Sequence, residues 1–132
     1  MSTIRILMLA LVFMFSTVKS KEQIQGHSVK SYSYHPVKGQ CHGNPLITAD
    51  GSRIDLKKLK SGRLRWIAVS RDLLRHYRMG DTVRVISEHK GVSGKWVIRD
   101  KMGPSHRMSI DFLTHPSSKI KYPRKVTIAK NL

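Results

Sequence analysis

The chain has 132 residues, of which 39% are hydrophobic, and it carries 25 Lys and Arg against 8 Asp and Glu, a formal net charge of +17. This length suits one small domain, and the patterned apolar residues exclude a disordered polyelectrolyte. The charge predicts a polyanionic partner, which is nucleic acid, anionic lipid or an acidic cell-wall polymer.

The first twenty residues are typical of a secretory signal peptide. Arg5 precedes an apolar run, Ile6–Phe15, which is too short to span a bilayer because a spanning helix needs about 20 residues. Small and polar residues follow up to Ser20, as expected before a cleavage site. We therefore expect a signal peptide over 1–20, a linker over 21–28 and a folded domain over 29–132, in a protein that is secreted, periplasmic or held at the cell envelope.

Export argues against nucleic acid, and the aromatic residues form no recognisable stacking motif for single strands. Without Arg5 and Lys19 the remaining chain carries +15. The single Cys41 cannot form an internal disulfide, and no second Cys or His follows at zinc-ligand spacing, so we predict no metal and no cofactor. We expect a monomer with no membrane span after cleavage, whose partner is peptidoglycan or another anionic envelope glycan.

Six short segments have the alternation or the short apolar runs of β-strands. We expect strands over Val29–His35, Leu64–Ser70, Thr82–Ser87, Lys95–Arg99, Met108–Leu113 and Lys125–Ala129, with no internal repeat. Val83 and Val85 are expected to face inward. Alternation puts Trp96 with Ile98, Met108 with Ile110 and Phe112, and Val126 with Ile128 on one face of their strands.

Two helical patches lie between these segments, over Asp55–Lys60 and Ser70–Tyr77. In the second, Ser70 is expected to cap the first turn, while Leu73, Leu74 and Tyr77 share one face. Six strands with two helical turns predict a mainly β fold, a small closed barrel, because closure removes the exposed edges of the sheet.

Two of the eight acidic residues lack an ordinary structural explanation. Asp100 ends one expected strand, and Asp111 lies inside the apolar segment Met108–Leu113. A carboxylate there is costly unless it is hydrogen-bonded or performs chemistry. If Ile110 and Phe112 face inward, Asp111 faces outward, and the alternatives are a solvated carboxylate or a general acid in a groove.

For a general acid, apolar neighbours such as Trp66 or Trp96 would raise the pKa of Asp111 toward the value of roughly 6 that suits a carboxylic acid catalyst. Between the two aspartates lies the loop Lys101–Arg107, in which His106 and Arg107 are placed to meet an anionic ligand.

Several segments together resemble a known family. They are Ile67–Leu74, Met79–Val85, Gly94–Asp100, Ser109–Leu113 and Arg124–Ile128, with Tyr34–Gly43 and Thr48–Gly51 upstream. Over residues 29 to 130 the chain resembles the three-aspartate (3D) domain and rare lipoprotein A, and the wider double-psi β-barrel group, which includes the catalytic barrel of membrane-bound lytic transglycosylase A and the expansins. The interval of 11 residues between Asp100 and Asp111 is the most specific element.

The resemblance implies a six-stranded double-psi barrel with Asp111 as general acid/base and Asp100 as its neighbour in the groove. With these two as catalytic residues, we expect Trp96, His106, Arg107 and Tyr34 to bind the substrate. The chain departs from the family where the first aspartate is due: it has Ala68-Val69-Ser70-Arg71, and Asp72 is displaced by two positions.

We therefore expect a secreted enzyme that cleaves peptidoglycan glycan strands, of the lytic-transglycosylase or O-glycosyl-hydrolase type. The alternatives are a non-catalytic, expansin-like barrel that binds peptidoglycan and a secreted protease inhibitor on the same scaffold. The missing first aspartate favours the binding barrel, and the retained pair of acids favours the enzyme.

Overall fold

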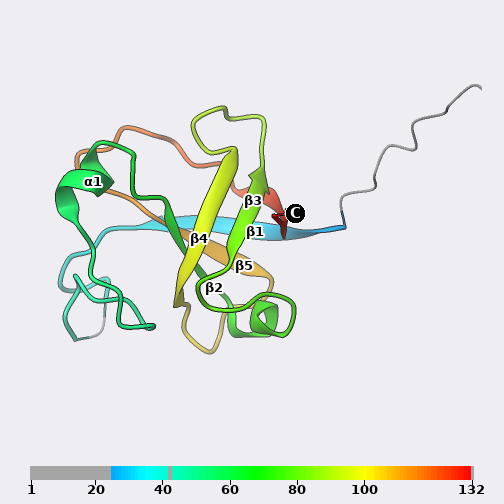
Figure 1. Ribbon diagram of the computed structural model, residues 1–132, viewed down its shortest axis with the longest axis horizontal. Coiled ribbons are helices and arrows are strands. Elements are labelled where there is room, and N and C mark those ends of the chain that lie inside the picture. Colours follow the sequence, from blue (N-terminus) through cyan, green and yellow to red (C-terminus); the bar gives the residue numbers. More distant parts are fainter. Residues whose placement is uncertain (1–24, 42, 132) are drawn as a thin grey trace, which may run out of the picture.

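The structure, a computed structural model, describes residues 25–41 and 43–131, so the predicted signal peptide lies outside the described residues. Six strands close into a barrel with two short helical segments, which confirms the expected mainly β barrel (Figure 1). The elements are β1 Gly26–Tyr34, α1 Leu56–Lys60, β2 Trp66–Val69, the 3₁₀ helix η2 Arg71–Arg75, β3 Thr82–Ile86, β4 Gly94–Lys101, β5 Ser109–Leu113 and β6 Lys125–Lys130.

The strands follow the closed order β1-β5-β2-β4-β3-β6. The pairs β1–β5 and β2–β4 are parallel, and the other four pairs are antiparallel. If β1, β2 and β3 are exchanged with β4, β5 and β6 respectively, the same six strand pairs result, each with the same parallel or antiparallel direction. This internal twofold arrangement, with its two matched parallel pairs, is in keeping with the double-psi topology that the resemblance implied.

The twofold arrangement relates residues in β2 and β3 to residues 43 positions later in β5 and β6. In the pairing register Ile67 corresponds to Ile110, and Val85 corresponds to Ile128. The correspondence keeps apolar character at core positions, whereas outward positions such as Ala68 and Asp111 differ, so the sequence alone shows no repeat. The strand pairing thus reveals an internal repeat where the sequence predicted none.

The barrel interior is filled by the inward faces of all six strands. Val83, Val85, Ile98, Ile110, Phe112 and Ile128 are fully buried, as their alternation predicted. Leu73 and Tyr77, in and just after η2, join the same cluster. Each of these large side chains stabilises the fold by about 1.5–3 kcal/mol through burial alone.

Contrary to expectation, Met108 does not lie in a strand beside Ile110 and Phe112. It precedes β5, is 40% exposed and has a φ of 43°, in the left-handed region that non-glycine residues rarely adopt. Its N–H donates to Asp72 Oδ2 at 2.9 Å, and its carbonyl accepts from the Lys30 N–H at 2.9 Å. Both backbone groups are therefore satisfied in a reversal that turns the chain into β5.

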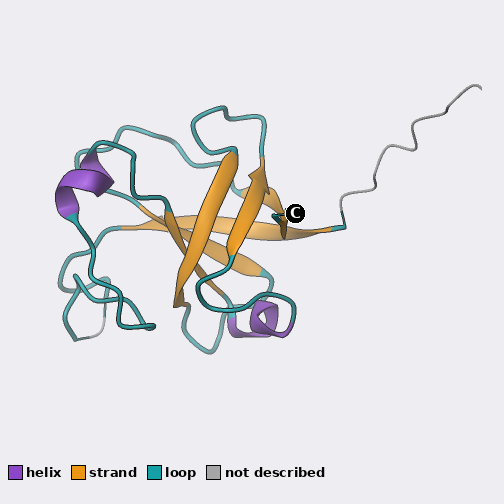
Figure 2. Ribbon diagram, viewed as in Figure 1, coloured by secondary structure: helices purple, strands orange, loops and turns teal. Residues whose placement is uncertain are grey.

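A second, smaller cluster lies outside the barrel beneath α1. Leu59 of α1 packs with Ile54, Leu64 and Leu113. The Asp55 carboxylate caps this helix by accepting from the N–H groups of the next two lysines, Lys57 and Lys58. The strands dominate the fold, and the two short helices lie at different ends of it (Figure 2). In the part of the chain that the structure describes, no helix is long and apolar enough to cross a membrane.

Candidate active site

Four residues stand in one row across four adjacent strands. Tyr32 of β1 pairs with Asp111 of β5, which pairs with Ala68 of β2, which pairs with Asp100 of β4. The two acids are therefore two strands apart, with backbones about 10 Å from each other at the usual strand spacing. The methyl group of Ala68 is the only side chain between them in the row.

A β-bulge brings Asp100 into this row. Ile67 pairs with Ile98, but the next residue, Ala68, pairs with Asp100, so that Arg99 is the extra residue in β4. A bulge re-aims the side chains that follow it. Because Ile98 faces the core, strict alternation would turn Asp100 inward as well, and the extra residue instead turns it outward to the side of Ala68 and Asp111.

Three residues of this row, Asp111, Ala68 and Asp100, form the floor of an open cleft of about 540 Å³. One wall comes from the segment between β1 and α1, and the other comes from the end of β4, the loop after it and the start of η2. The residues lining the cleft are Tyr34, Gln40, Cys41, Pro45, Ile47, Thr48, Ala49, Ala68, Arg71, Asp100, Lys101, Met102, Gly103, Pro104, His106 and Asp111.

Asp111 faces outward from the barrel, as its position between the buried Ile110 and Phe112 predicted. Its Oδ1 atom is buried and has no hydrogen-bond partner in the described part of the chain. Burial in the cleft and, second, the negative charge of Asp100 raise the pKa of Asp111 from 3.8 to about 7. At neutral pH a large share of this carboxyl is therefore protonated and able to donate.

Asp100 is held by three donors. Its Oδ1 accepts from the N–H groups of Ala49 at 3.0 Å and Lys101 at 2.9 Å, and its Oδ2 accepts from the Tyr34 hydroxyl at 3.3 Å. Burial and the Asp100 charge raise the pKa of the Tyr34 phenol far above its ordinary value, so that Tyr34 stays a neutral donor. The two acids thus differ: Asp100 is a fixed acceptor, and Asp111 is a free acid.

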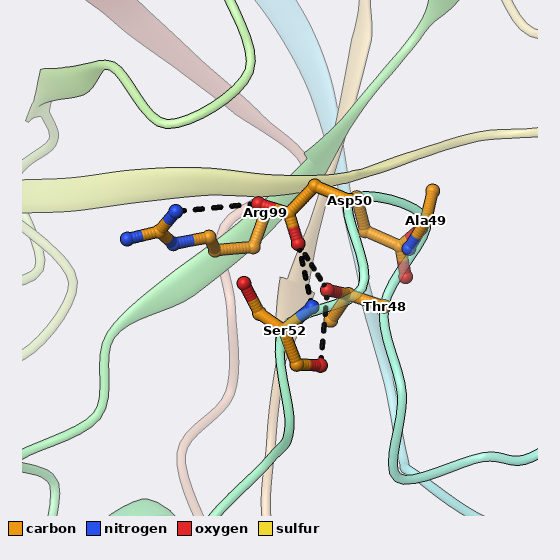
Figure 3. A network of polar contacts seen from close by, with 6 residues as sticks. Thr48, Ala49, Asp50, Ser52 and Arg99 are labelled. Carbon is orange, nitrogen blue, oxygen red and sulfur yellow. Dashed lines mark hydrogen bonds and ion pairs between the residues drawn. The ribbon is translucent and has the colours of Figure 1, made fainter.

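The wall that carries Ala49 is fastened by Asp50 (Figure 3). The Asp50 carboxylate accepts from the Thr48 hydroxyl at 2.6 Å and the Ser52 N–H at 3.0 Å, and it pairs with Arg99 Nη1 at 3.3 Å. Burial alone would raise the pKa of Asp50, but these donors outweigh burial and lower it. Arg99, the extra residue of the bulge, therefore ties the wall to the strand that presents Asp100.

Of the six predicted site residues, the structure brings together Asp111, Asp100, Tyr34 and His106, which all line the cleft. Trp96 lies elsewhere: it is 4% exposed, packs edge-on against Phe112 in the barrel interior and donates from Nε1 to the Val92 carbonyl at 2.7 Å. Its place on the inward face of β4 leaves it unable to contact a ligand in this cleft.

Arg107 also lies outside the cleft lining. Its Nη1 donates to the carbonyls of Pro104 at 2.6 Å and His106 at 3.0 Å, so the guanidinium shapes the loop from within. The tryptophans are not what buries Asp111, because Trp66 packs against the second cluster and neither ring lines the cleft. The burial of Asp111 instead comes from the cleft and its walls.

The position of the missing first aspartate has a structural role here. Ser70 is fully buried; its hydroxyl donates to Asp72 Oδ1 at 2.5 Å and accepts from the Ser109 N–H at 3.0 Å. It therefore does not cap η2 with its side chain, contrary to expectation. Asp72 accepts from Ser70, Leu73 and Met108, and these bonds lower its pKa although burial alone would raise it. Asp72 thus joins β2, η2 and the start of β5 and lines no part of the cleft.

Sequence reasoning missed the residues that give the cleft its shape, namely Ala68, Arg71 and the wall around Ala49. A single alanine in an apolar strand gives no signal of its own, and the pairing of Ala49 with Asp100 joins positions far apart in the sequence. In the ranges 25–41 and 43–131, no group of three or more His, Cys, Asp or Glu residues is arranged to hold a metal ion.

Comparison with known proteins leaves the family open. A scan against protein-family models finds no match, and a search of curated proteins finds none either. The resemblance to the 3D domain and rare lipoprotein A therefore remains a prediction, and the functional argument rests on the geometry of the cleft.

Proposed function

We propose that this protein is an exported enzyme that cleaves the glycan strands of peptidoglycan, with Asp111 as general acid and then general base. The observation that carries the proposal is the state of the Asp111 side chain. Its Oδ1 atom is buried and has no hydrogen-bond partner among the described residues, and the pKa of its carboxyl group is about 7. It lies in an open cleft beside a second, hydrogen-bonded carboxylate, that of Asp100. Pairs of carboxyl groups whose environments differ in this way mark acid–base sites.

The reaction requires Asp111 to donate one proton and then to accept another. Protonated Asp111 donates to the glycosidic oxygen, and the bond between that oxygen and the anomeric carbon breaks. The 6-hydroxyl of the same muramic acid attacks the anomeric carbon, closes a 1,6-anhydro ring and gives its proton to the Asp111 carboxylate. The acid is regenerated without water, so a second proton-transferring residue is not required.

Asp100 then has an electrostatic role. Its carboxylate, held in place by Ala49, Lys101 and Tyr34, is suited to stabilise the positive charge that develops on the anomeric carbon. A backbone spacing of about 10 Å between the two acids leaves room for a sugar ring over Ala68. This division of roles supports cleavage by one acid rather than by a pair that shares a water.

The test replaces Asp111 by Asn, which keeps the size of the side chain and removes the proton. We expect the release of anhydromuropeptides from purified sacculi, measured by mass spectrometry, to fall by at least about 100-fold, since general acid–base catalysis contributes this much or more. Asp81→Asn is the matched control, because among the described residues the Asp81 carboxylate accepts only from the Arg78 N–H in a turn, and Asp81 lines no part of the cleft. Undiminished release by the Asp111 variant would refute the proposal.

The pH dependence tests the same acid in the unaltered protein. Because donation requires the protonated form, we expect the rate of release to fall as pH rises through about 7. A rate that keeps rising up to pH 9 would show that Asp111 does not act as the acid.

A second candidate is a non-catalytic barrel that binds peptidoglycan. The use of Ser70 and Asp72 as structural ties favours it, because the first acid of the family pattern is then unavailable for chemistry. The same experiment separates the two: wild type and Asp111→Asn that bind sacculi equally, with no soluble product from either, would establish the binding barrel.

A further inference from the structure

The two walls of the cleft differ in charge. The wall between β1 and α1 presents neutral side chains to the cleft: Gln40, Cys41, Pro45, Ile47, Thr48 and Ala49. The opposite wall presents three basic side chains: Arg71 from the first residue of η2, Lys101 from the last residue of β4, and His106 from the loop that follows. Both acids lie on the floor between these walls.

Within residues 25–41 and 43–131, the basic side chains of this wall take part in no ion pair and no hydrogen bond. Among the described residues the one ion pair joins Arg99 to Asp50, and no hydrogen bond there involves the side chain of Arg71, Lys101 or His106. The imidazole of His106 lies edge to face with the exposed ring of Tyr32, with centroids 5.9 Å apart. Arg71 and Lys101 are exposed, so that their charges face the cleft and solvent.

An unpaired basic wall next to the proposed reacting centre is suited to an anionic group on the substrate. We infer that Arg71 and Lys101, with His106 beside them, form a subsite for a carboxylate carried by the sugar at the bond that is cleaved. This inference rests on the proposed function and narrows its substrate class: the glycan is recognised by a carboxylate, and the neutral wall with Pro45 and Ile47 contacts the uncharged face of the sugar chain.

Two groups of peptidoglycan supply such a carboxylate. One is the lactyl ether of muramic acid when no peptide is attached, and the other is the peptide stem. Arginine binds a carboxylate through two parallel N–H donors, and lysine adds a point charge. Both groups offer the same chemistry to the wall, so the experiment includes each of them.

The test compares the double variant Arg71→Gln/Lys101→Gln with the control Arg84→Gln/Lys95→Gln. The control removes two exposed charges from paired positions of β3 and β4 that lie outside the cleft lining. The substrates are peptide-bearing strands, strands freed of peptide, and strands of each kind with carboxylates converted to amides. Circular dichroism and melting temperature establish that both variants fold as wild type does.

We expect the Arg71/Lys101 variant to raise KM about tenfold on the carboxylate-bearing strands, with kcat changed by less than twofold, because lost charge-assisted hydrogen bonds weaken ground-state binding by this order. On amidated strands we expect wild type to have a higher KM than on carboxylate-bearing strands, and we expect the variant to have the same KM as wild type. The control leaves both constants unchanged. Whichever of the two carboxylate substrates shows the effect identifies the source of the group.

Two outcomes would overturn the inference while leaving the glycan-cleaving function intact. One is an equal KM of wild type on carboxylated and amidated strands, and the other is an equal effect of the two double variants. If wild type releases no product from any strand, the proposed function fails separately. Binding of fluorescent strands by Asp111→Asn then decides the subsite: tenfold weaker binding of amidated strands supports it, and equal binding refutes it.

Discussion

At Asp111 a strongly basic protein keeps one carboxyl group from ionising freely. The surplus of Lys and Arg would favour a carboxylate almost anywhere on the surface, yet burial in the cleft and the nearby Asp100 charge dominate at this position. The Oδ1 atom of Asp111 is buried and has no donor among the described residues, and a buried acceptor without a donor costs free energy. The Asp111 side chain therefore lowers the stability of the fold at the position for which we propose catalysis.

This cost gives Asp111→Asn a stability phenotype that depends on pH. The pKa is raised in the folded state, so between about pH 4 and 7 the unfolded chain releases a proton that the folded chain retains, and stability falls as pH rises. Asn has no proton to lose. Allowing for solvent in the cleft, we expect a gain of about 1 kcal/mol at pH 8, or about 4–8 °C in Tm, and almost none at pH 4.

Thermal melts of wild type, Asp111→Asn and Asp81→Asn at both pH values measure this gain. The Asp81 control accounts for the general effect of removing a negative charge from this chain. A gain of equal size at pH 4 and pH 8 would contradict the assignment of a raised pKa to Asp111.

Among the elements, the connection between β3 and β4 depends on one side chain that precedes β2. The Arg65 guanidinium donates to the carbonyls of Gly91, Val92, Ser93 and Lys95 at 3.0–3.3 Å and lies 4.3 Å from the centroid of Trp96. Burial lowers the pKa of Arg65. One planar cation thus binds four backbone carbonyls where the connection enters β4, and it packs on the Trp96 ring of the core.

We expect Arg65→Lys to destabilise the protein by about 1–2 kcal/mol, because lysine keeps the charge but cannot reach the same carbonyls with a planar fork. Amide exchange in residues 87–95 is expected to speed up more than exchange in β5. Arg84→Lys, on the exposed face of β3, is the control and is expected to be neutral. An equal loss in both variants would show that the fork geometry is unimportant.

The elements also show what the sequence can and cannot predict. Alternation located all six strands and the inward faces of β3 and β6, because Val83, Val85, Val126 and Ile128 each repeat at the period of a strand. Alternation cannot show the bulge at Arg99 or the left-handed residue Met108, since both arise where neighbouring strands must match their registers.

The candidate site was predictable to a similar extent. Period two and the apolar neighbours of Asp111 sufficed to place its side chain on the outer face. The assignment of Trp96 to the binding surface did not agree with the structure because the same alternation that points Ile98 inward points Trp96 inward too. The basic wall depends on η2 and the loop after β4 coming together, which no local pattern encodes.

At the scale of the whole molecule, few of the positive charges in the described residues form internal ion pairs. Only one ion pair, between Arg99 and Asp50, occurs among the described residues of a chain with 25 Lys and Arg. Most of this charge is therefore available to attract a polyanion over a distance set by the ionic strength.

We expect adsorption to purified sacculi to fall by about tenfold or more between about 0.01 and 1 M NaCl, over which the Debye length shrinks from about 30 to 3 Å. Pelleting assays over a series of salt concentrations measure it. Adsorption that does not respond to salt would assign binding to contacts in the cleft instead of net charge.

The correspondence of residues 43 positions apart has a consequence for how the chemistry is distributed along the chain. The core positions of one half match the core positions of the other, but the position that matches Asp111 is Ala68, and the position that matches Asp100 is Tyr32, 68 positions earlier in β1. Because all four side chains lie on the outer face of the barrel, although Ala68 is buried there, each half can change its chemistry without altering the barrel interior that both halves share.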